Sequence, residues 1–374
     1  MSRGKRWLTI TGCAALFVFT AACSGELPSE PDTGIELAMG RVALAGQLGA
    51  IPGYGCAIKR DETLVCWGLN TAGRLGIGSI DKDGVPYPAT PVLIPAGVKL
   101  SFVTTGFRHA CAVALDGRLF CWGANAYGQL GTGDREPSAV PVQVAAPNGV
   151  RFARVANSST TTCALSTTGT VYCWGLGSSG QVGDGTLTRR VLEPTPLAGV
   201  DGVRFVDVAL GYVHGCAVSE AGEVYCWGQL DYDNCGCESA YTPTPAKMEL
   251  PTTDRFVRIA GGSPATTTCA LTEGGEAFCW TPGTVEPTRA NVNRALIALS
   301  VGINHACGLD KDGTPVCWVL PRDFASPAVL DVPKRSFSAV AAGGDATCGI
   351  VADGTELVCW GTDELSVLGD ALAL

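Results

Sequence analysis

The sequence has little charge, few histidines and no basic cluster beyond its first few positions. Charged side chains make up 16% of its 374 residues, the formal net charge is −9, and only three histidines are present. Proteins that bind nucleic acids need a basic track along the phosphate backbone. No Lys/Arg cluster of that kind follows residue 6, so nucleic acid is not an expected partner.

Catalytic motifs are also missing. The chain has no Gly-x-Ser-x-Gly elbow, metalloprotease helix, phosphate-binding loop or dinucleotide fingerprint. Its histidines, His109, His214 and His305, share one repeat position two residues before a cysteine, and other repeats carry other residues there. We interpret them as repeat residues that hydrogen-bond within their own repeat rather than as general bases. We expect no enzyme activity, cofactor or metal.

The sequence does contain a repeated pattern of cysteine followed by tryptophan. A unit of Cys, nine residues, Cys and Trp occurs six times, and a seventh copy is one residue longer. The seven copies account for fourteen of the 18 cysteines and seven of the 8 tryptophans. Such regularity indicates one supersecondary unit repeated along a single domain. In chain order, the pairs are Cys56 and Cys66, Cys111 and Cys121, Cys163 and Cys173, Cys216 and Cys226, Cys269 and Cys279, Cys307 and Cys317, and Cys348 and Cys359.

The spacing within each unit predicts a β-hairpin. Between Cys111 and Cys121, two short apolar runs flank Asp116-Gly117, and a three-residue loop would place Gly117 in the left-handed position. Only the first copy, with 60–62 as its loop, lacks a glycine in or beside the loop. The paired cysteines then face each other within disulfide range, so we predict seven hairpin disulfides. Zinc is the rival interpretation, but structural zinc sites favour short Cys-x-x-Cys spacings.

Two smaller motifs have structural interpretations. Cys235 and Cys237 are separated by one residue, unlike a thioredoxin-like pair, and no histidine lies nearby in the sequence. We favour a disulfide between them over a redox or metal pair. Three Asp-rich segments resemble parts of calcium loops but lack the distal glutamate, so we interpret them as turns. They are residues 81–84, 231–234 and 310–313.

Side-chain alternation predicts that both faces of each hairpin are apolar. In the second copy, Cys111 and Val113 share one face, and Ala112 and Phe120 share the other. Sheets that are apolar on both faces can stack around a ring, which also protects their edges. Steps of 55, 52, 53, 53, 38 and 42 residues between tryptophans leave room for four short strands per unit. The predicted fold class is all-β, a seven-bladed β-propeller whose blade hairpins each carry a disulfide.

The N-terminus is predicted to be an export signal. Three basic residues, Arg3, Lys5 and Arg6, precede an apolar stretch over 7–22 that is short for a membrane span. The small residues before Cys23 resemble a bacterial lipobox, although Thr20 departs from its usual leucine. Cys23 is therefore expected to be lipidated, with ordinary cleavage and a free Cys23 as the alternative. The expected organisation is a signal peptide over 1–22, lipidated cysteine and tether over 23–33, and propeller over 34–374.

Export agrees with the disulfides and sets the expected location. Oxidising compartments outside the cytosol are where disulfides persist. Loss of the signal segment, with three positive charges and no acid, lowers the net charge from −9 to −12. We expect a lipid-anchored protein of the cell envelope, in the outer membrane of a Gram-negative host because Ser24 follows Cys23. Without lipidation it would be secreted.

A second set of motifs surrounds the cysteines and tryptophans. In the second copy, Gly106-Phe-Arg-His109 precedes the first cysteine, and Asn125-Ala-Tyr-Gly128-Gln-Leu-Gly131 follows the tryptophan. Similar segments follow Trp67 and Trp174. These repeats resemble the regulator of chromosome condensation family over roughly residues 40–370. The resemblance implies a seven-bladed propeller.

The resemblance implies a fold more than an activity. The eukaryotic member is a nuclear nucleotide exchange factor for a small GTPase, whereas this sequence predicts export, disulfides and an acidic chain. Fold alone does not transfer function. Secreted bacterial propellers of this repeat type include a beta-lactamase inhibitor protein, so we expect a monomeric binding scaffold for an unknown protein or polysaccharide of the cell surface. The alternative is a carbohydrate-active enzyme with carboxylates around its channel; exchange activity is less expected.

The same resemblance places the segment before each first cysteine among connections that gather on one face of the ring. Loops there can vary while the strands hold the scaffold. Aromatic and arginine side chains are enriched in binding hot spots, which favours Phe107, Arg108 and Tyr212 as anchors. The full set of candidate contact residues is Tyr54, Phe107, Arg108, His109, Tyr212, His214, Asn304, His305 and Asp345.

The pattern breaks in the later repeats. The Asn-x-x-Gly-Gln-Leu-Gly turn is replaced after Trp227 and absent after Trp280 and Trp318. The last repeat also ends without the Pro-x-Val strand seen in earlier copies. We therefore expect residues 35–44 to complete the last blade and close the ring.

Overall fold

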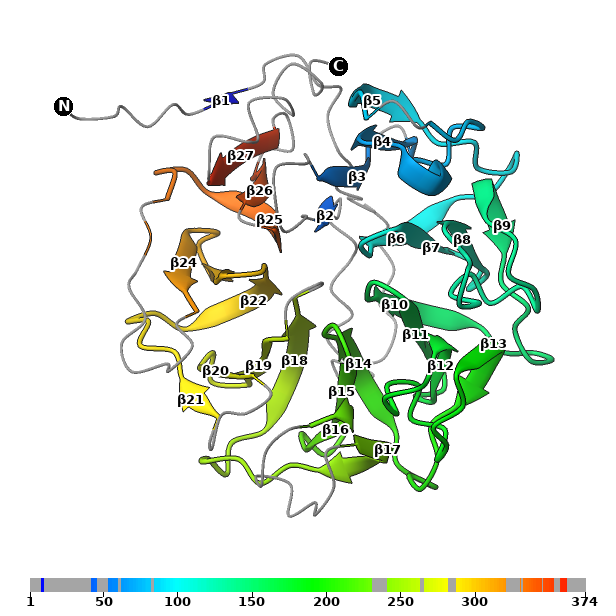
Figure 1. Ribbon diagram of the computed structural model, residues 1–374. Coiled ribbons are helices and arrows are strands. Elements are labelled where there is room, and N and C mark those ends of the chain that lie inside the picture. The colour runs from blue at the N-terminus through cyan, green and yellow to red at the C-terminus, as the bar shows by residue number, and fades with distance from the viewer. Residues whose placement is uncertain are drawn as a thin grey trace, which may run out of the picture.

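The computed structural model describes residues 8–9, 42–45, 53–59, 62–81, 84–230, 241–262, 266–281, 287–320, 330, 332–344, 346–352 and 357–361. These residues form seven antiparallel sheets arranged as blades around a central axis (Figure 1). We number the blades from one to seven in the order of their cysteine pairs. Within the described ranges, no helix has the length and apolar character needed to cross a membrane.

Blades one to four have four strands each, with the first strand innermost. In these blades the strands run in sheet order from the axis to the rim. Their bounds are β2 (Val42–Ala45), β3 (Tyr54–Ile58), β4 (Leu64–Gly68) and β5 (Tyr87–Pro91); β6 (Leu100–Thr105), β7 (His109–Ala114), β8 (Leu119–Gly123) and β9 (Ser138–Gln143); β10 (Phe152–Asn157), β11 (Thr161–Ser166), β12 (Val171–Leu176) and β13 (Arg190–Pro196); β14 (Phe205–Leu210), β15 (His214–Ser219), β16 (Val224–Gln229) and β17 (Tyr241–Lys247).

Blades five to seven are less regular at the rim. The fourth strand of blade five has two residues, and blade six shows three strands in the described part of the chain. Their bounds are β18 (Phe256–Gly261), β19 (Thr268–Thr272), β20 (Ala277–Trp280) and β21 (Thr288–Arg289); β22 (Leu296–Val301), β23 (His305–Asp310) and β24 (Pro315–Val319); β25 (Phe337–Gly343), β26 (Ala346–Val351) and β27 (Leu357–Gly361). The seven-bladed, all-β prediction is confirmed.

The predicted hairpin register is also confirmed. Cys111 lies directly opposite Cys121, and the Ala114 N–H donates to the carbonyl of Arg118 at 2.8 Å, which closes the three-residue loop. Gly117 takes the left-handed conformation with φ of 80°. Loop length and strand pairing therefore agree with the spacing of the repeat.

All seven predicted hairpin disulfides are formed, with Cα atoms 4.0–4.1 Å apart. Each joins the second and third strands of one blade, and the interpretation of these cysteines as zinc ligands is therefore excluded. From blade one to blade seven, Cys56 is bonded to Cys66, Cys111 to Cys121, Cys163 to Cys173, Cys216 to Cys226, Cys269 to Cys279, Cys307 to Cys317, and Cys348 to Cys359. The additional pair expected between Cys235 and Cys237 lies outside the described residues and stays a prediction.

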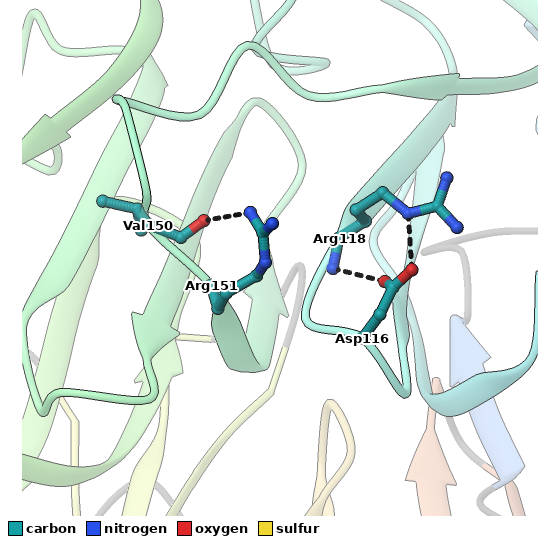
Figure 2. A network of polar contacts seen from close by, with 4 residues as sticks. All are labelled: Asp116, Arg118, Val150 and Arg151. Carbon is teal, nitrogen blue, oxygen red and sulfur yellow. Dashed lines mark hydrogen bonds and ion pairs between the residues drawn. The ribbon is translucent and has the colours of Figure 1, made fainter.

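Figure 2 shows the tip of the blade-two hairpin and the start of the next blade. Asp116 accepts a hydrogen bond from the Arg118 backbone N–H at 3.0 Å and pairs with the same residue's Nε at 2.7 Å. The backbone N–H of Arg118 lowers the pKa of Asp116 below its usual value. Arg151, which precedes β10, lies beside Gly117. Exposed ion pairs of this kind contribute little to stability, so their effect is mainly to order the turn.

The first hairpin makes the same turn without glycine. Glu62 takes the left-handed position with φ of 68°, and its N–H donates to the carbonyl of Lys59 at 2.9 Å. A side chain in this region costs roughly 1–2 kcal/mol relative to glycine. The hairpin geometry is thus imposed by strand pairing and the disulfide even where the turn residue is unfavourable.

One of the Asp-rich segments is a turn, as predicted. Asp310 Oδ1 accepts hydrogen bonds from the N–H groups of Asp312 at 2.9 Å and Thr314 at 2.8 Å, and Arg294 pairs with its other oxygen. Because both oxygens are engaged within the hairpin, this carboxylate closes a turn. Residues 82–83 and 231–234, in the other two segments, lie outside the described ranges.

The hydrophobic core is divided into layers between neighbouring blades. Ala112 and Phe120 pack toward blade one, and Cys111 and Val113 pack toward blade three, where they meet Trp174. Both faces of the central hairpin are therefore buried, as the alternation predicted. Burial of both faces explains why the second and third strands of each blade read as nearly continuous apolar segments.

Tryptophan side chains connect consecutive blades. The Nε1–H of Trp122 donates to the carbonyl of Arg74 at 2.9 Å, Trp174 to Gln129 at 2.9 Å, and Trp227 to Gln181 at 3.0 Å. Each acceptor belongs to the turn after the third strand of the preceding blade. In blades two to four the tryptophan thus pairs with the turn of the previous repeat, whereas Nε1 of Trp67 and of Trp280 has no hydrogen-bond partner among the described residues.

The ring does not close as the sequence predicted. Val42–Ala45 forms β2, which pairs with β3 as the innermost strand of blade one instead of completing blade seven. It lies between β25 of blade seven and β6 of blade two. Pairing with the adjacent β3 closes a short loop, which costs less chain entropy than joining a strand more than 300 residues away.

Blade seven receives another N-terminal strand at its rim. β1 (Leu8–Thr9) pairs with β27, with Leu8 opposite Cys359. These two residues belong to the segment that the sequence predicts to be removed on export. Cleavage before Cys23 would leave β27 without this partner.

Candidate functional site

The loops between the first and second strands lie at one end of the ring and touch one another from blade to blade. The Ile303 N–H donates to the Gly344 carbonyl at 2.9 Å, which connects the loops of blades six and seven. A Cβ on Gly106 would lie 2.2 Å from the carbonyl oxygen of Ser158, in the loop of blade three. The predicted contact residues that the structure describes therefore belong to loops at this end of the ring, which we call the loop face.

His109 is completely buried within this belt and contacts the neighbouring blade. Its Nε2 lies 2.8 Å from Thr162 Oγ1, and the Thr162 hydroxyl donates to the carbonyl of Gln129 at 2.8 Å. Because the only hydroxyl proton is used there, His109 Nε2 carries the proton and donates. Burial lowers the pKa of His109 to about 3, so the ring is neutral at physiological pH.

The same contact recurs on alternate blades. His214 Nε2 lies 2.7 Å from Thr268 Oγ1, and His305 Nε2 lies 2.7 Å from Thr347 Oγ1. Histidine thus occurs on blades two, four and six, and its threonine partner on blades three, five and seven. Burial lowers the pKa of His214 to about 4. The prediction that these histidines hydrogen-bond within their own blade is wrong, because the acceptor lies across the blade interface.

The glycine three residues before each histidine makes room for its ring. A Cβ on Gly211 would lie 2.2 Å from Cε1 of His214, and one on Gly302 would lie 2.6 Å from Cε1 of His305. At Gly106 the corresponding distance is 3.2 Å. The joint occurrence of Gly and His in a Gly-x-x-His pattern was the sequence signal for a packed structural histidine.

Tyr54 plays the same part between blades one and two. It is 1% exposed, and its hydroxyl lies 2.8 Å from the carbonyl oxygen of Gly106 and 2.7 Å from that of His109. Burial raises the pKa of Tyr54. Tyr54, His109 and His214 are therefore part of the scaffold, and the prediction that they contact a partner is not supported; His305 is 7% exposed and equally inaccessible.

The other predicted residues lie at the surface. Tyr212 is 47% exposed, Arg108 and Asn304 are exposed, and Phe107 is half-buried. The Arg108 guanidinium lies 5.7 Å from the centre of the Phe107 ring. Asp345 lies outside the described residues. The accessible part of the predicted site is thus Phe107, Arg108, Tyr212 and Asn304.

Sequence reasoning missed Arg74, which lies beneath the Phe107–Arg108 loop. Arg74 is 1% exposed, donates from Nε to the Leu69 carbonyl at 2.7 Å and from Nη1 to the Phe107 carbonyl at 3.0 Å. Its guanidinium stacks 4.5 Å from the centre of the Tyr54 ring. Burial lowers the pKa of Arg74, and nearby Arg108 acts in the same direction.

A departure from the repeat was the available signal for Arg74. It occupies the position held by Gln129 and Gln181 in the later Asn-x-x-Gly-Gln-Leu-Gly turns. Among the described residues its Nη2 has no hydrogen-bond partner. The loop face therefore carries a buried positive charge directly below an exposed arginine.

The carboxylates expected of a glycosidase do not converge in the described part of the channel. Asp207 and Asp312 are the acidic residues of that lining. Asp207 accepts hydrogen bonds from the N–H groups of Val208 and Ile259, both at 3.1 Å, and is 7% exposed. No group of three His, Cys, Asp or Glu side chains that could hold a metal occurs within the described ranges.

Two family models match the chain. Both are described as regulator of chromosome condensation (RCC1) repeat; one matches residues 116–165 and 168–218, and the other 101–129, 154–181 and 205–237. Taken together, the two models cover the disulfide hairpins of blades two, three and four, with Trp122, Trp174 and Trp227. Residues 101–237 of this chain therefore contain RCC1 repeats.

Curated relatives share these repeats over part of their length. The Ultraviolet-B receptor UVR8 of Arabidopsis thaliana is 33% identical over 215 residues, which are 57% of this chain and 48% of the relative. The human E3 ubiquitin-protein ligase HERC2 is 32% identical over 216 residues, 56% of this chain and 4% of the relative. The chain thus spans about half or less of the length of these relatives.

Solved structures show the same fold. Human WBSCR16 has a TM-score of 0.69 at 19% identity, with 96% of this chain and 100% of that chain covered. Prp20p of Saccharomyces cerevisiae has a TM-score of 0.65 at 18% identity, with 86% and 83% covered. At these identities the similarity concerns the propeller alone.

Proposed function

We propose that this RCC1-repeat propeller is an exported binding scaffold that is anchored in the cell envelope through Cys23 and holds a partner protein on its loop face without catalysing a reaction. The observation that carries the proposal is the contrast within the loop face. Half-buried Phe107 and exposed Arg108 and Tyr212 lie above a buried layer of Tyr54 and histidine contacts. Such preorganised aromatic and arginine groups are the usual anchors of protein interfaces.

Rigid support is what makes these side chains suitable anchors. The Phe107 carbonyl is held by Arg74, and His109, two residues further on, is held by Thr162. A partner would therefore meet loops whose backbone is already ordered, which reduces the entropy lost on binding. Prp20p, which has the same fold, has binding properties to Gsp1p and histones, and this supports protein binding as a use of the propeller.

Electrostatics favours a partner with acidic groups at this point of the loop face. Arg108 and the buried Arg74 lie close enough for Arg108 to lower the pKa of Arg74, and no ion pair to either is formed within the described residues. A carboxylate of the partner placed beside Arg108 would be attracted by both charges. Polysaccharide binding is the other outcome of the test.

The test is capture of partners from an envelope extract with the purified mature protein, followed by affinity measurements. Phe107→Ala combined with Tyr212→Ala should weaken binding by tenfold or more, about 1.4 kcal/mol, with an unchanged melting temperature. Leu187→Ala is the matched control, because Leu187 is 52% exposed but belongs to the turn after β12. Unchanged affinity in the double variant would move the binding site off the loop face, and turnover of any glycan would overturn the scaffold proposal.

A further inference from the structure

A cavity of about 580 Å³ lies on the axis of the ring, apart from the loop face proposed for partner binding. Its described lining comes from the innermost strands of blades two to seven, β6, β10, β14, β18, β22 and β25, which surround the centre in Figure 1. Residues near the β23–β24 hairpin, including Lys311 and Asp312, border one end of it. Its size is within the usual range of small-molecule sites.

One position of the innermost strand decides the charge of this lining. In each blade the residue follows a β-bulge and lies opposite an apolar residue of the second strand. From blade two to blade seven the residues are Phe102, Arg154, Asp207, Arg258, Ala298 and Ala339. The charged residues are therefore gathered on blades three to five, and small apolar ones on blades six and seven.

Asp207 lies at ion-pair distance from Arg154, and both of its carboxylate oxygens accept hydrogen bonds from backbone N–H groups. Its Oδ1 accepts from the Val208 N–H at 3.1 Å and lies 3.8 Å from Arg154 Nε, and its Oδ2 accepts from the Ile259 N–H at 3.1 Å. The Ile259 amide belongs to β18, the innermost strand of the next blade. Asp207 is thus hydrogen-bonded by two backbone donors, and the Arg154 guanidinium lies beside it at ion-pair distance.

Arg154 retains two nitrogens for a ligand. Its side chain is 23% exposed, and the pairing through Nε leaves Nη1 and Nη2 without a partner among the described residues. A guanidinium oriented in this way can form paired hydrogen bonds to a carboxylate or phosphate. The lining carries Arg154, Arg258 and Lys311 against Asp207 and Asp312, an excess of one positive charge in a chain of net charge −9.

Small side chains occupy the next lining position, two residues further along each strand. Because they are short, they leave space beside the charged position, and most of their surface is apolar. They are Thr104, Ala156, Ala209, Ala260, Ser300 and Ala341. The Ser300 hydroxyl oxygen already accepts a hydrogen bond from the Ala342 N–H at 2.9 Å.

We propose that the axial cavity binds a compact organic anion, whose carboxylate or phosphate group pairs with Arg154 and whose apolar body lies against the ring of small side chains. The chemistry is anion recognition by a preoriented guanidinium next to an apolar chamber.

The test uses the full chain and three six-carbon probes, hexanoate, hexyl phosphate and 1-hexanol, titrated by calorimetry. Either anion should bind at least tenfold more tightly than the alcohol, because only the anions pair with the guanidinium. The relative affinities of hexanoate and hexyl phosphate identify the preferred charged group. Equal affinity for the alcohol, or no binding of either anion up to about 10 mM, would overturn the proposal.

Variants connect the binding to these residues. Arg154→Gln should weaken anion binding tenfold or more, and Arg154→Lys should restore only part of it because the fork is lost. Ala260→Leu should exclude the apolar body while Arg154 is retained. Arg135→Gln is the matched control, since Arg135 is exposed in the turn after β8, away from the cavity. Unchanged affinity in Arg154→Gln contradicts the assignment even if Ala260→Leu fails to fold.

Discussion

His109 on blade two and Thr162 on blade three are joined by a buried hydrogen bond of 2.8 Å, in which the imidazole Nε2–H is the donor. The Trp174 Nε1–H donates to the same Gln129 carbonyl as the Thr162 hydroxyl, so this backbone oxygen accepts two hydrogen bonds across the blade interface. The histidines of the repeat thus connect neighbouring blades, whereas each disulfide joins two strands of the same blade. Disulfides thus stabilise individual blades, whereas the histidine–threonine hydrogen bonds stabilise the interfaces between blades.

Removal of the Thr162 hydroxyl should destabilise the propeller. Thr162→Val keeps the shape but leaves the His109 Nε2–H buried without an acceptor, which costs about 1–3 kcal/mol. Thr160→Val is the control, because Thr160 is half-buried and its hydroxyl makes no side-chain hydrogen bond to the described residues. Denaturant unfolding of Thr162→Val, of His109→Ala and of the double variant gives the coupling energy, with Thr160→Val measured alongside. Additive effects of the two changes would contradict the contact.

Stability should fall as the pH drops below about 6.5. In the unfolded chain a histidine takes up a proton near that pH, whereas the folded-state pKa is lowered to about 3 for His109 and about 4 for His214. The unfolded state therefore binds more protons between pH 6.5 and about 4, and the folded state loses stability throughout this window. At pH 5 each histidine contributes a loss of about 2 kcal/mol. A His109→Gln/His214→Gln variant should show a shallower decline in thermal unfolding scans, and a slope equal to wild type would contradict the prediction.

A side chain at Gly117 should destabilise the protein more than a side chain at Gly149, which has open space around it. Gly117→Ala places a Cβ at φ of 80° and 2.6 Å from the Arg151 Cβ on the next blade, beside the hairpin tip in Figure 2. Gly149→Ala is matched in φ at 79° but has no atom within 4 Å of the new Cβ. Both should lose roughly 1–2 kcal/mol for the left-handed conformation, and Gly117→Ala should lose more. Equal melting temperatures of the two variants would contradict the prediction, because they would show that the contact with Arg151 has no energetic cost.

Lipidation at Cys23 remains a prediction from the sequence. Metabolic labelling with a fatty-acid analogue should tag the wild-type protein and fail to tag Cys23→Ala. The variant should also leave the membrane fraction, because the acyl anchor supplies the attachment. Equal labelling of both proteins would exclude this residue as the lipid site.

The sequence predicted the fold in detail wherever a local rule applied. Spacing placed Cys111 opposite Cys121, and Gly117 in the left-handed position, because hairpin register follows from loop length alone. The exposure of the candidate contact residues was predicted less well. Arg108 and Tyr212 are exposed as expected, but Tyr54 and His109 are buried, since the neighbouring blade covers them and no periodicity within one blade reports on that neighbour.

The identity of the repeated unit, its disulfides and the number of blades were determined by the sequence alone, because each depends on residues about ten positions apart. Tertiary structure decided everything that depends on the meeting of two blades. It assigned Val42–Ala45 to the first blade, paired His109 with Thr162, buried Arg74 under Phe107, and brought Arg154 and Asp207 together at the axis. These residues lie 30 or more positions apart in most cases, and only closure of the ring fixes which side chains share an interface.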